Sequence, residues 1–283
     1  MSHSIKNYTL NNGVEIPEIG FGTWQTPDGA TAILAVKSAL ENGYRHIDTA
    51  AIYGNEKSIG QAIAESGISR KELFITSKLW NSERGYDSTL KAFDKTLKDL
   101  QTDYLDLYLI HWPATEKQFA DWQQQNADTW RAFEKLYEDG KIKAIGVSNF
   151  LVHHLEALLV NAKVKPVINQ IEYHPGYLQP EIVALCQKEN ILIEAWSPLG
   201  TGKMLTNAVL MEIAARYQVT VAQLCIRWCL QNGTLPLPKS ITPERIQQNL
   251  DVYGFTITDA DMEAINALPY IGGSGLYPDD VDF

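Results

Sequence analysis

Short apolar runs alternate along this chain with longer stretches in which apolar side chains recur every three or four residues. The runs are rich in Ile, Val, Leu and Tyr and about six or seven residues long, which is typical of parallel strands buried on both faces. Eight such runs follow one another, at Glu18–Thr23, Arg45–Ala50, Leu73–Leu79, Leu105–His111, Lys143–Asn149, Val167–Tyr173, Ile191–Ser197 and Thr234–Ser240. The pattern therefore predicts eight strands, each followed by a helix.

The stretches between the runs have the spacing of amphipathic helices. Residues 87–100, for example, place Leu90, Phe93 and Leu97 on one face and charged side chains on the other. Because consecutive parallel strands need crossover helices, the alternation predicts an α/β protein with a (β/α)8 TIM-barrel fold. An open doubly wound sheet is disfavoured, since the glycines at 20–22 lack the third glycine of a dinucleotide-binding fingerprint.

Three segments fall outside the repeat. A β-hairpin is expected at residues 8–16, around an Asn-Asn-Gly turn, and we expect it to cap one end of the barrel. The connections at 112–126 and 269–283 are longer than needed, and long connections in compact domains are often lids or binding loops. No linker divides the chain, so we expect one domain, residues 1–283, that includes the C-terminal tail.

Composition excludes several classes of protein. The 283 residues carry a formal net charge of -10, and without a basic run such a chain repels nucleic acid and anionic membranes. Cys186, Cys225 and Cys229 match no metal-ligand spacing, so we expect buried thiols in a reducing compartment. The first thirteen residues are polar, and no apolar run approaches the ~20 residues that span a bilayer. We expect a cytoplasmic protein with no nucleic-acid or membrane partner.

Most of the predicted strands carry a polar, ionisable or aromatic residue at or near their C-terminal end. In a parallel barrel these ends share one face, so the side chains of different strands converge there. The residues concerned are Asp48, Lys78, His111, Ser148, Asn149, Gln170, Trp196, Ser197, Lys239 and Ser240. The sequence predicts a functional site at this mouth of the barrel.

Four residues at this mouth suit proton transfer. A lysine in a desolvated barrel mouth needs a partner, so we expect Lys78 to pair with Asp48. Tyr53 can fold back beside Lys78, and an ammonium next to a phenol is expected to lower the tyrosine pKa from about 10. Tyr53 would then serve as a general acid, while His111 donates a hydrogen bond to a substrate carbonyl. Each residue alone has an ordinary explanation in packing or solvation, but their joint occurrence favours a catalytic function.

The same segments carry a resemblance to a known family. Residues 43–50 and 53–56 resemble the signature of the aldo-keto reductases around their catalytic aspartate and tyrosine. Further matching blocks are Thr76–Trp80, Leu109–Pro113, Gly146–Phe150 and Pro238–Pro243. Together they cover nearly the whole chain in order and are highly specific. The compact length resembles the bacterial branch that includes 2,5-diketogluconate and glyoxal or methylglyoxal reductases.

The resemblance implies a role for each of these residues. It implies a catalytic tetrad of Asp48, Tyr53, Lys78 and His111. It also implies that Trp196, where many relatives carry tyrosine, stacks on a nicotinamide ring. Cofactor contacts are implied for Gly22, Thr23, Asp48, Ser148, Asn149, Gln170, Ser197 and Leu199, and substrate contacts for Trp24, Tyr53, Trp80, His111 and Trp112. Packing at the barrel rim is the alternative explanation for the three tryptophans.

A phosphate site is expected after the eighth strand. The residues concerned are Lys239, Ser240, Thr242 and Arg245. Thr242 can cap a helix, and a helix N-terminus beside a lysine and an arginine suits a phosphate group. An ordinary capped surface helix is the alternative. The resemblance extends the cofactor site to Asn249 near the adenine and to Gln248, where a glutamate is common in relatives.

Three other functions were weighed against this one. A barrel aldolase would need a Lys78 of depressed pKa, whereas Asp48 is expected to keep Lys78 charged. A metal hydrolase is disfavoured because His153, His154 and His174 form no ligand set with zinc spacing, and we expect no metal. A cofactor-binding regulatory subunit with little turnover is a third possibility, which the intact tetrad and the lack of an added partner-binding segment disfavour.

The sequence thus predicts an NADPH-dependent enzyme that reduces a small aldehyde, dicarbonyl or keto sugar to the alcohol. NADPH is expected rather than NADH because Lys239 and Arg245 offer cationic donors to a 2′-phosphate. A monomer is expected, as in the family that the chain resembles.

Overall fold

The structure is a computed structural model and describes residues 5–283. Its centre is a sheet of eight parallel strands that neighbour one another in chain order. The strands are β3 (Phe21–Gly22), β4 (His46–Asp48), β5 (Phe74–Leu79), β6 (Leu105–Ile110), β7 (Ile142–Ser148), β8 (Ile168–Glu172), β9 (Leu192–Trp196) and β10 (Leu235–Leu237). The N–H groups of Gly20 and Gly22 donate to the carbonyls of Pro236 and Pro238 at 3.1 and 3.0 Å, which closes the sheet into a barrel. The predicted (β/α)8 fold is confirmed.

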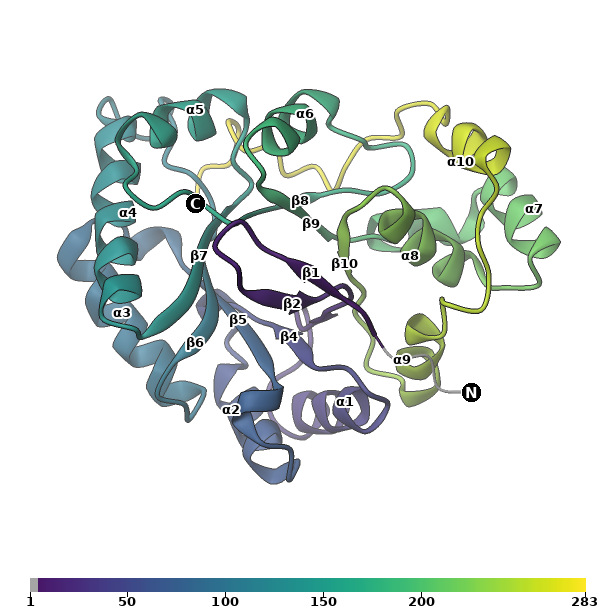
Figure 1. Cartoon of the computed structure of the whole chain (residues 1–283), viewed down its shortest axis with the longest axis horizontal. Coiled ribbons are helices and arrows are strands. Elements are labelled where there is room, and N and C mark those ends of the chain that lie inside the picture. Colours follow the sequence, from purple (N-terminus) through teal and green to yellow (C-terminus); the bar gives the residue numbers. More distant parts are fainter. Residues whose placement is uncertain (1–4) are drawn as a thin grey trace.

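Helices surround the barrel (Figure 1). Their bounds are α1 (Ala30–Glu41), α2 (Glu56–Glu65), α3 (Tyr86–Asp99), α4 (Trp122–Glu138), α5 (Val152–Asn161), α6 (Pro180–Lys188), α7 (Ala208–Arg216), α8 (Val221–Gln231), α9 (Pro243–Leu250) and α10 (Asp259–Asn266). Short 3-10 turns lie at η1 (Ala51–Tyr53), η2 (Arg70–Glu72), η3 (Asn81–Glu83) and η4 (Gly200–Thr206). Among residues 5–283, no single helix has the length and apolar composition to cross a bilayer. Only α7 and α8 taken together would have that length and composition, and they are bent by 85° relative to each other.

The first and last strands are shorter than predicted. The apolar runs Glu18–Thr23 and Thr234–Ser240 become strands of two and three residues. The residues beside them meet across the closing seam through single hydrogen bonds instead of a continuous ladder. An apolar pattern in the sequence indicates that residues are buried. Most of these residues are buried, but they are not hydrogen-bonded as a continuous strand.

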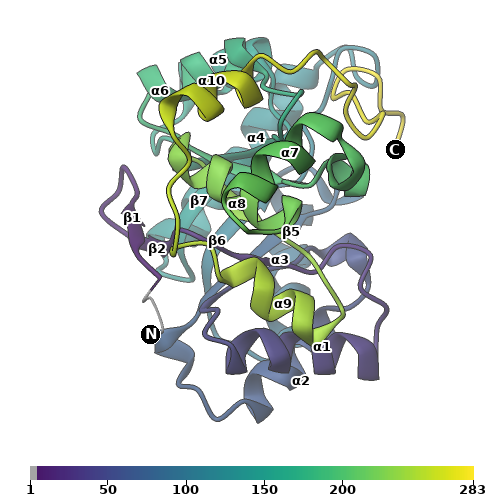
Figure 2. The same cartoon turned by 90° about the vertical axis from the view of Figure 1, so that its right-hand side faces the viewer.

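An N-terminal hairpin closes one end of the barrel. β1 (Asn7–Thr9) pairs antiparallel with β2 (Glu15–Pro17), and the hairpin contributes Leu10 and Ile16 to an apolar cluster with residues from five of the barrel strands. Side chains of the hairpin also donate to the carbonyls of Lys143, Pro166 and Thr234, which lie at or just before the starts of strands. The hairpin therefore seals the N-terminal end, as predicted, and leaves the C-terminal mouth for chemistry (Figures 1 and 2).

The C-terminal tail, residues 269–283, lies at the end of the barrel opposite the hairpin (Figure 2). The buried carboxylate of Glu172 accepts the N–H and the hydroxyl of Ser274 at 2.8 to 3.0 Å. A Cβ at Gly273 would lie 2.6 Å from a Glu172 oxygen, so only glycine allows this approach. Farther on, the carbonyl of Phe283 accepts hydrogen bonds from Asn81 and Gln118. The segment that the sequence predicts as a possible lid is tied down across the mouth.

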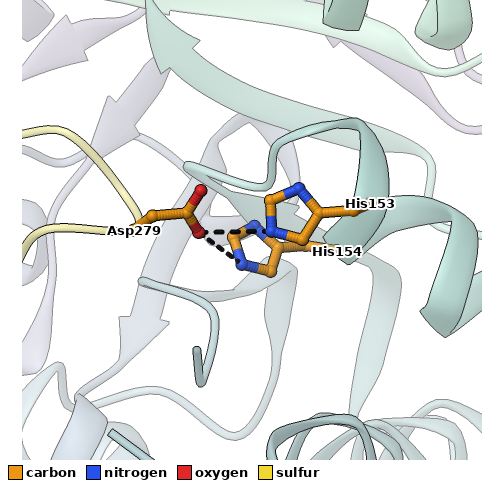
Figure 3. Close-up of side chains that lie close together, drawn as sticks. All are labelled: His153, His154 and Asp279. Atoms are coloured by element: carbon orange, nitrogen blue, oxygen red, sulfur yellow. Dashed lines mark hydrogen bonds and ion pairs between the residues drawn. The ribbon is translucent and has the colours of Figure 1, made fainter. Parts of the chain in front are cut away.

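A cluster that we call the tail clasp, His153, His154 and Asp279, adds another attachment (Figure 3). One oxygen of Asp279, Oδ1, lies 3.2 Å from His153 Nε2 and 3.1 Å from His154 Nε2. Of the two rings, only His153 is hydrogen-bonded to Asp279; His154 Nδ1 accepts the N–H of Leu151, so the hydrogen of its neutral ring sits on Nε2, which has no hydrogen-bond partner among the described residues. Burial, with a contribution from His153, lowers the pKa of His154 to about 3 and keeps the ring neutral. A metal ion would need the Nε2 lone pair, so the donors favour a clasp over a metal site.

Candidate active site

Lys78 is the centre of the site. It lies near the end of β5, is fully buried, and has three acceptors for its three ammonium hydrogens. Nζ donates to Asp48 Oδ1 at 2.7 Å, to the Thr49 carbonyl at 2.9 Å and to Tyr53 Oη at 3.3 Å. The predicted Lys78–Asp48 ion pair is present, and it places the ammonium against the phenol oxygen.

The charge of Lys78 follows from its partners. Burial alone would lower its pKa, but the attraction of Asp48 and Tyr53 and the hydrogen bond to Asp48 outweigh burial, and the net pKa is raised. Lys78 is therefore held as an ammonium ion, which is no nucleophile. This observation weakens the alternative of a Schiff-base aldolase.

Tyr53 sits in η1, just before Gly54, whose φ of 70° ends the turn in the left-handed region. The next residue, Asn55, donates to the carbonyls of Thr23 and Thr26 at 3.1 and 3.0 Å, which ties the Tyr53 loop to the loop after β3. These contacts explain how a loop residue is held over Lys78.

The expected lowering of the Tyr53 pKa is wrong in its net direction. Burial raises the pKa of Tyr53 and is the largest effect, while Lys78 lowers it and Asp48 raises it. The charge of Lys78 can be anticipated from the sequence, whereas the desolvation of Tyr53 depends on how deeply the fold buries it. Tyr53 is consequently a neutral phenol whose oxygen accepts a hydrogen bond from the Lys78 ammonium.

His111 follows β6 directly and is 7 % exposed. Burial and the charge of Lys78 lower its pKa well below the usual value, so the ring is neutral. Its ring lies with edge contacts against Tyr53 and Trp80, at centroid distances of 5.6 and 5.4 Å. A neutral imidazole in this position has one N–H to offer a carbonyl oxygen.

Asn149 connects three parts of the site. It lies after β7 with a φ of 62°. Its Nδ2 donates to the His111 carbonyl at 2.9 Å and to Ser148 Oγ at 3.1 Å, and its Oδ1 accepts the indole N–H of Trp196 at 2.9 Å. The tryptophan predicted as a stacking surface is thus fixed by a hydrogen bond to Asn149.

Gln170, on β8, stands between two buried carboxyl groups. Its Nε2 donates to Asp48 Oδ2 at 2.9 Å and to Glu194 Oε2 at 2.6 Å. Both amide hydrogens are committed, so Oε1 is the group that Gln170 can present to a ligand. Sequence reasoning missed Glu194. The signal that could have found it is alternation along β9, which puts Leu192, Glu194 and Trp196 on one face.

A cavity of about 960 Å³ opens beside these residues. Of the residues predicted to bind cofactor or substrate, it is lined by Gly22, Trp24, Asp48, Tyr53, Trp80, His111, Trp112, Ser148, Asn149, Gln170, Trp196, Ser197, Leu199, Lys239, Ser240, Arg245, Gln248 and Asn249. Two predicted cofactor residues lie outside the lining. Thr23 instead donates to the Asp48 carbonyl from both its N–H and its hydroxyl. Thr242 directly precedes α9, but its hydroxyl makes no cap; Ser240 Oγ accepts the Thr242 N–H at 3.1 Å.

One end of the cavity suits a phosphate. Lys239 Nζ donates to the carbonyl of Gln25 at 3.2 Å, and burial lowers its pKa. Arg245 is exposed on the first turns of α9, with Gln248 one turn farther along. Both cationic residues line the cavity, and Arg245 lies in the first turn of α9.

Part of the lining was not predicted at all. These residues are Gln25, Ile52, Pro198, Thr201, Gly202, Leu205, Thr220, Val221, Ala222, Leu237, Pro238, Leu276 and Phe283. Phe283 stacks on Trp80 at 5.4 Å and meets Trp112 edge-on at 5.5 Å, so the tail completes the aromatic end of the cavity. The only sequence signal for this contribution was the length of the tail.

Comparison with known proteins places this geometry in a family. Residues 18–269 match the model of the aldo/keto reductase family. A glyoxal reductase of Bacillus subtilis (strain 168) is 52% identical over 274 residues, which are 97% of this chain and 96% of that protein. A 9,11-endoperoxide prostaglandin H2 reductase of Trypanosoma cruzi (strain CL Brener) is 48% identical over 92% of this chain and 90% of its own length.

Solved structures agree. The aldo-keto reductase MGS-M4, from a deep-sea metagenome library of the Medee basin, superposes with a TM-score of 0.92 at 46% identity, over 98% of this chain and 100% of that one. A point mutant of Gox0644 in complex with NADPH gives a TM-score of 0.91 at 40% identity, over 99% and 100%. The chain belongs to the aldo/keto reductase family.

Proposed function

We propose that this protein reduces small carbonyl compounds with NADPH, and that Tyr53 donates the proton. The observation that carries the proposal is the ammonium of Lys78, which donates at once to Asp48 and to Tyr53 Oη beneath a cavity that His111 also lines. Membership of the family and the reductase names of its relatives support the same reaction class.

The residues of the cavity fit NADPH. Gln170 has only an amide oxygen to offer and so suits the NH₂ of a nicotinamide carboxamide, while Trp196 presents an indole fixed by Asn149. At the other end, Lys239 and Arg245 suit the 2′-phosphate. Gly22, which also lines the cavity, lets β3 lie close to the end of β10, because a Cβ there would lie 3.2 Å from the Leu237 carbonyl. A related structure holds NADPH.

The proton follows a short path from Tyr53. NADPH supplies the hydride that the carbonyl carbon gains. The carbonyl oxygen takes the proton of Tyr53 Oη, and the phenolate that remains is stabilised by the ammonium of Lys78. His111, neutral and in edge contact with Tyr53 and Trp80, donates its N–H to the carbonyl oxygen and fixes its position. Burial of Lys78 and Asp48 strengthens both interactions.

The substrate proposed is compact: an aldehyde, a small dicarbonyl such as methylglyoxal, or a keto sugar. Trp24, Trp80 and Trp112 are large, and Phe283 closes in on two of them. A panel of carbonyl compounds, followed by loss of NADPH absorbance, tests the proposal. The small dicarbonyls should give the highest kcat/KM, whereas a preference for a bulky polycyclic ketone would contradict this account of the pocket.

The same assay separates the alternatives. A regulatory subunit would bind NADPH without turning over any member of the panel. An aldolase would be trapped covalently on Lys78 by borohydride in the presence of a carbonyl substrate, which the raised pKa of Lys78 argues against. The monomeric state and the cytoplasmic location stay predictions, and gel filtration measures the first.

A further inference from the structure

Glu194 is a buried carboxyl group that the proposed reaction does not use. It lies in the middle of β9, points into the barrel and has no exposed surface. Its Oε2 accepts from Gln170, and its Oε1 lies 3.6 Å from His46 Nε2 without a hydrogen-bond partner among the described residues. Burying a carboxyl group is costly, so its presence here calls for a function.

The contacts of Glu194 decide which way round the Gln170 amide is held. With its NH₂ end between Asp48 Oδ2 and Glu194 Oε2, the amide makes two hydrogen bonds to carboxyl oxygens. The reversed amide would place its oxygen against Asp48, whose other oxygen already holds the Lys78 ammonium. Two acceptors on one side of Gln170 therefore keep its Oε1 on the other side, toward the cavity that Gln170 lines.

We propose that Glu194 is a positioning residue, which fixes the Gln170 amide so that its oxygen faces the carboxamide of the nicotinamide. The proposal rests on the proposed function, because Gln170 meets that group only if NADPH binds in this cavity. It adds Glu194 to an unbroken line of hydrogen bonds, in which Lys78 donates to Tyr53 and to Asp48. Gln170 in turn donates to Asp48 and to Glu194. These hydrogen bonds link the residue that would position the nicotinamide ring, Gln170, to the ammonium of Lys78 beside Tyr53.

The same placement gives Glu194 an effect on the pH dependence. The titratable groups that face it are His46 and Asp48 on β4 and Lys78 on β5, while β10 presents only apolar side chains and a proline, and β8 presents Gln170. Burial, followed by the repulsion of Asp48, raises the pKa of Glu194 to about 8. Above that pH its negative charge adds to that of Asp48 and raises the pKa of Tyr53 further. The charge therefore helps Tyr53 to keep its proton at alkaline pH.

Two substitutions separate positioning from packing. Glu194→Gln keeps an oxygen that accepts from Gln170 but cannot ionise, whereas Glu194→Met has a similar volume and no such acceptor. The Met variant should bind NADPH roughly fivefold more weakly in a fluorescence titration, the effect of one lost hydrogen bond, and the Gln variant should bind within about twofold of wild type. Glu56→Gln, at a buried carboxyl outside the barrel, is the control and should bind NADPH normally.

Two further readouts show whether Glu194 acts through Gln170. In a Gln170→Ala background, Glu194→Met should cause no additional loss of NADPH affinity, because the amide that it positions is gone. The alkaline limb of the kcat profile should move to lower pH in Glu194→Gln and stay in place in Glu56→Gln. If the Met variant does not fold, the pH profile of Glu194→Gln still tests the proposal.

The proposal is overturned if the Met variant binds NADPH like wild type, if its loss persists in full in the Gln170→Ala background, or if the alkaline limb of Glu194→Gln does not move. These outcomes are distinct from failure of the proposed function, which would show as a wild-type protein that reduces no carbonyl compound with NADPH.

Discussion

At the scale of single residues, the site depends on one buried ammonium that serves two oxygens. Lys78 is paired with Asp48 and at the same time donates to Tyr53, so its charge lies where the proposed reaction would form a phenolate. The raised pKa of Tyr53 keeps the phenol protonated, as the proposed proton transfer requires. Burial and Lys78 keep His111 from becoming a cation, so in the proposed reaction it is a neutral donor.

The substitution Tyr53→Phe isolates the proton. We expect kcat for carbonyl reduction to fall by ~10²- to 10⁴-fold, the usual contribution of a general acid. NADPH affinity and the far-ultraviolet circular dichroism spectrum should stay close to those of the wild type, since only a hydroxyl is lost. Steady-state kinetics with a small aldehyde measure the effect. A variant that kept a third of the wild-type kcat would falsify the role of Tyr53.

Arg245→Ala tests the phosphate end of the cavity. Arg245 is exposed on α9 and can offer two parallel N–H groups to a 2′-phosphate. Losing a charge-assisted hydrogen bond should lower kcat/KM for NADPH roughly tenfold or more and leave that for NADH nearly unchanged. Arg216→Ala, on α7, is the matched control. Equal use of both cofactors by the wild type, or an unchanged preference in Arg245→Ala, would rule out the phosphate site while leaving the tetrad intact.

At the scale of secondary-structure elements, most of the fold follows from periodicity. Eight buried runs predicted eight strands, and the C-terminal ends of those strands predicted Asp48, Lys78 and His111 as neighbours, which the structure confirms. Such residues are predictable because a parallel barrel brings strand ends together regardless of their distance in the sequence. Tyr53 was placed correctly beside Lys78, but the sign of its pKa shift depends on burial, which the sequence does not show.

The contacts of the C-terminal tail were not predicted, because they depend on packing between residues far apart in the sequence. Asp279 meets His153 and His154 from 126 and 125 positions away, and Phe283 meets Trp80 across the mouth. No periodicity fixes where a tail without helix or strand will lie. Glu194 escaped for a different reason, because a charged residue inside an apolar strand was counted as part of the run rather than as an inward-facing group.

The tail clasp gives a prediction about an element rather than about the chemistry. Asp279→Ala removes the carboxylate that holds His153 and His154, and so frees the segment that carries Leu276 and Phe283 to the cavity. The KM for the carbonyl substrate should rise about two- to tenfold, as expected for a lost hydrogen-bonded contact, with little change in NADPH affinity. Asp282→Ala, an exposed acidic residue of the same tail, is the control. A KM equal to that of the wild type would show that the clasp does not shape the pocket.

At the scale of the whole molecule, one end of the barrel is filled and the other holds the cavity. The hairpin fills the N-terminal end with Leu10 and Ile16, while the tail leaves a cavity at the other end and only covers part of it. Several histidines are buried in the folded protein. Burial lowers the pKa of His46 and of His154 to about 3, so the unfolded chain binds protons there that the folded chain does not, and stability falls as the pH drops below about 6.5.

Glu56 acts in the opposite direction and is the clearest test of this balance. Its carboxyl group is buried between β5 and α3, where Ser77 Oγ donates to it at 2.6 Å, and burial raises its pKa from 4.5 to about 7. The folded state therefore holds this proton more tightly than the unfolded state. Its contribution to stability is fully present below pH 4.5 and is lost as the pH rises through 7. Glu56→Gln keeps an acceptor for Ser77 and removes the titration, so its free energy of unfolding, relative to the wild type, should increase by up to about 3 kcal/mol between about pH 4.5 and 8. Urea unfolding at several pH values measures this difference, and a difference that stays constant with pH would show that Glu56 does not titrate in the folded protein.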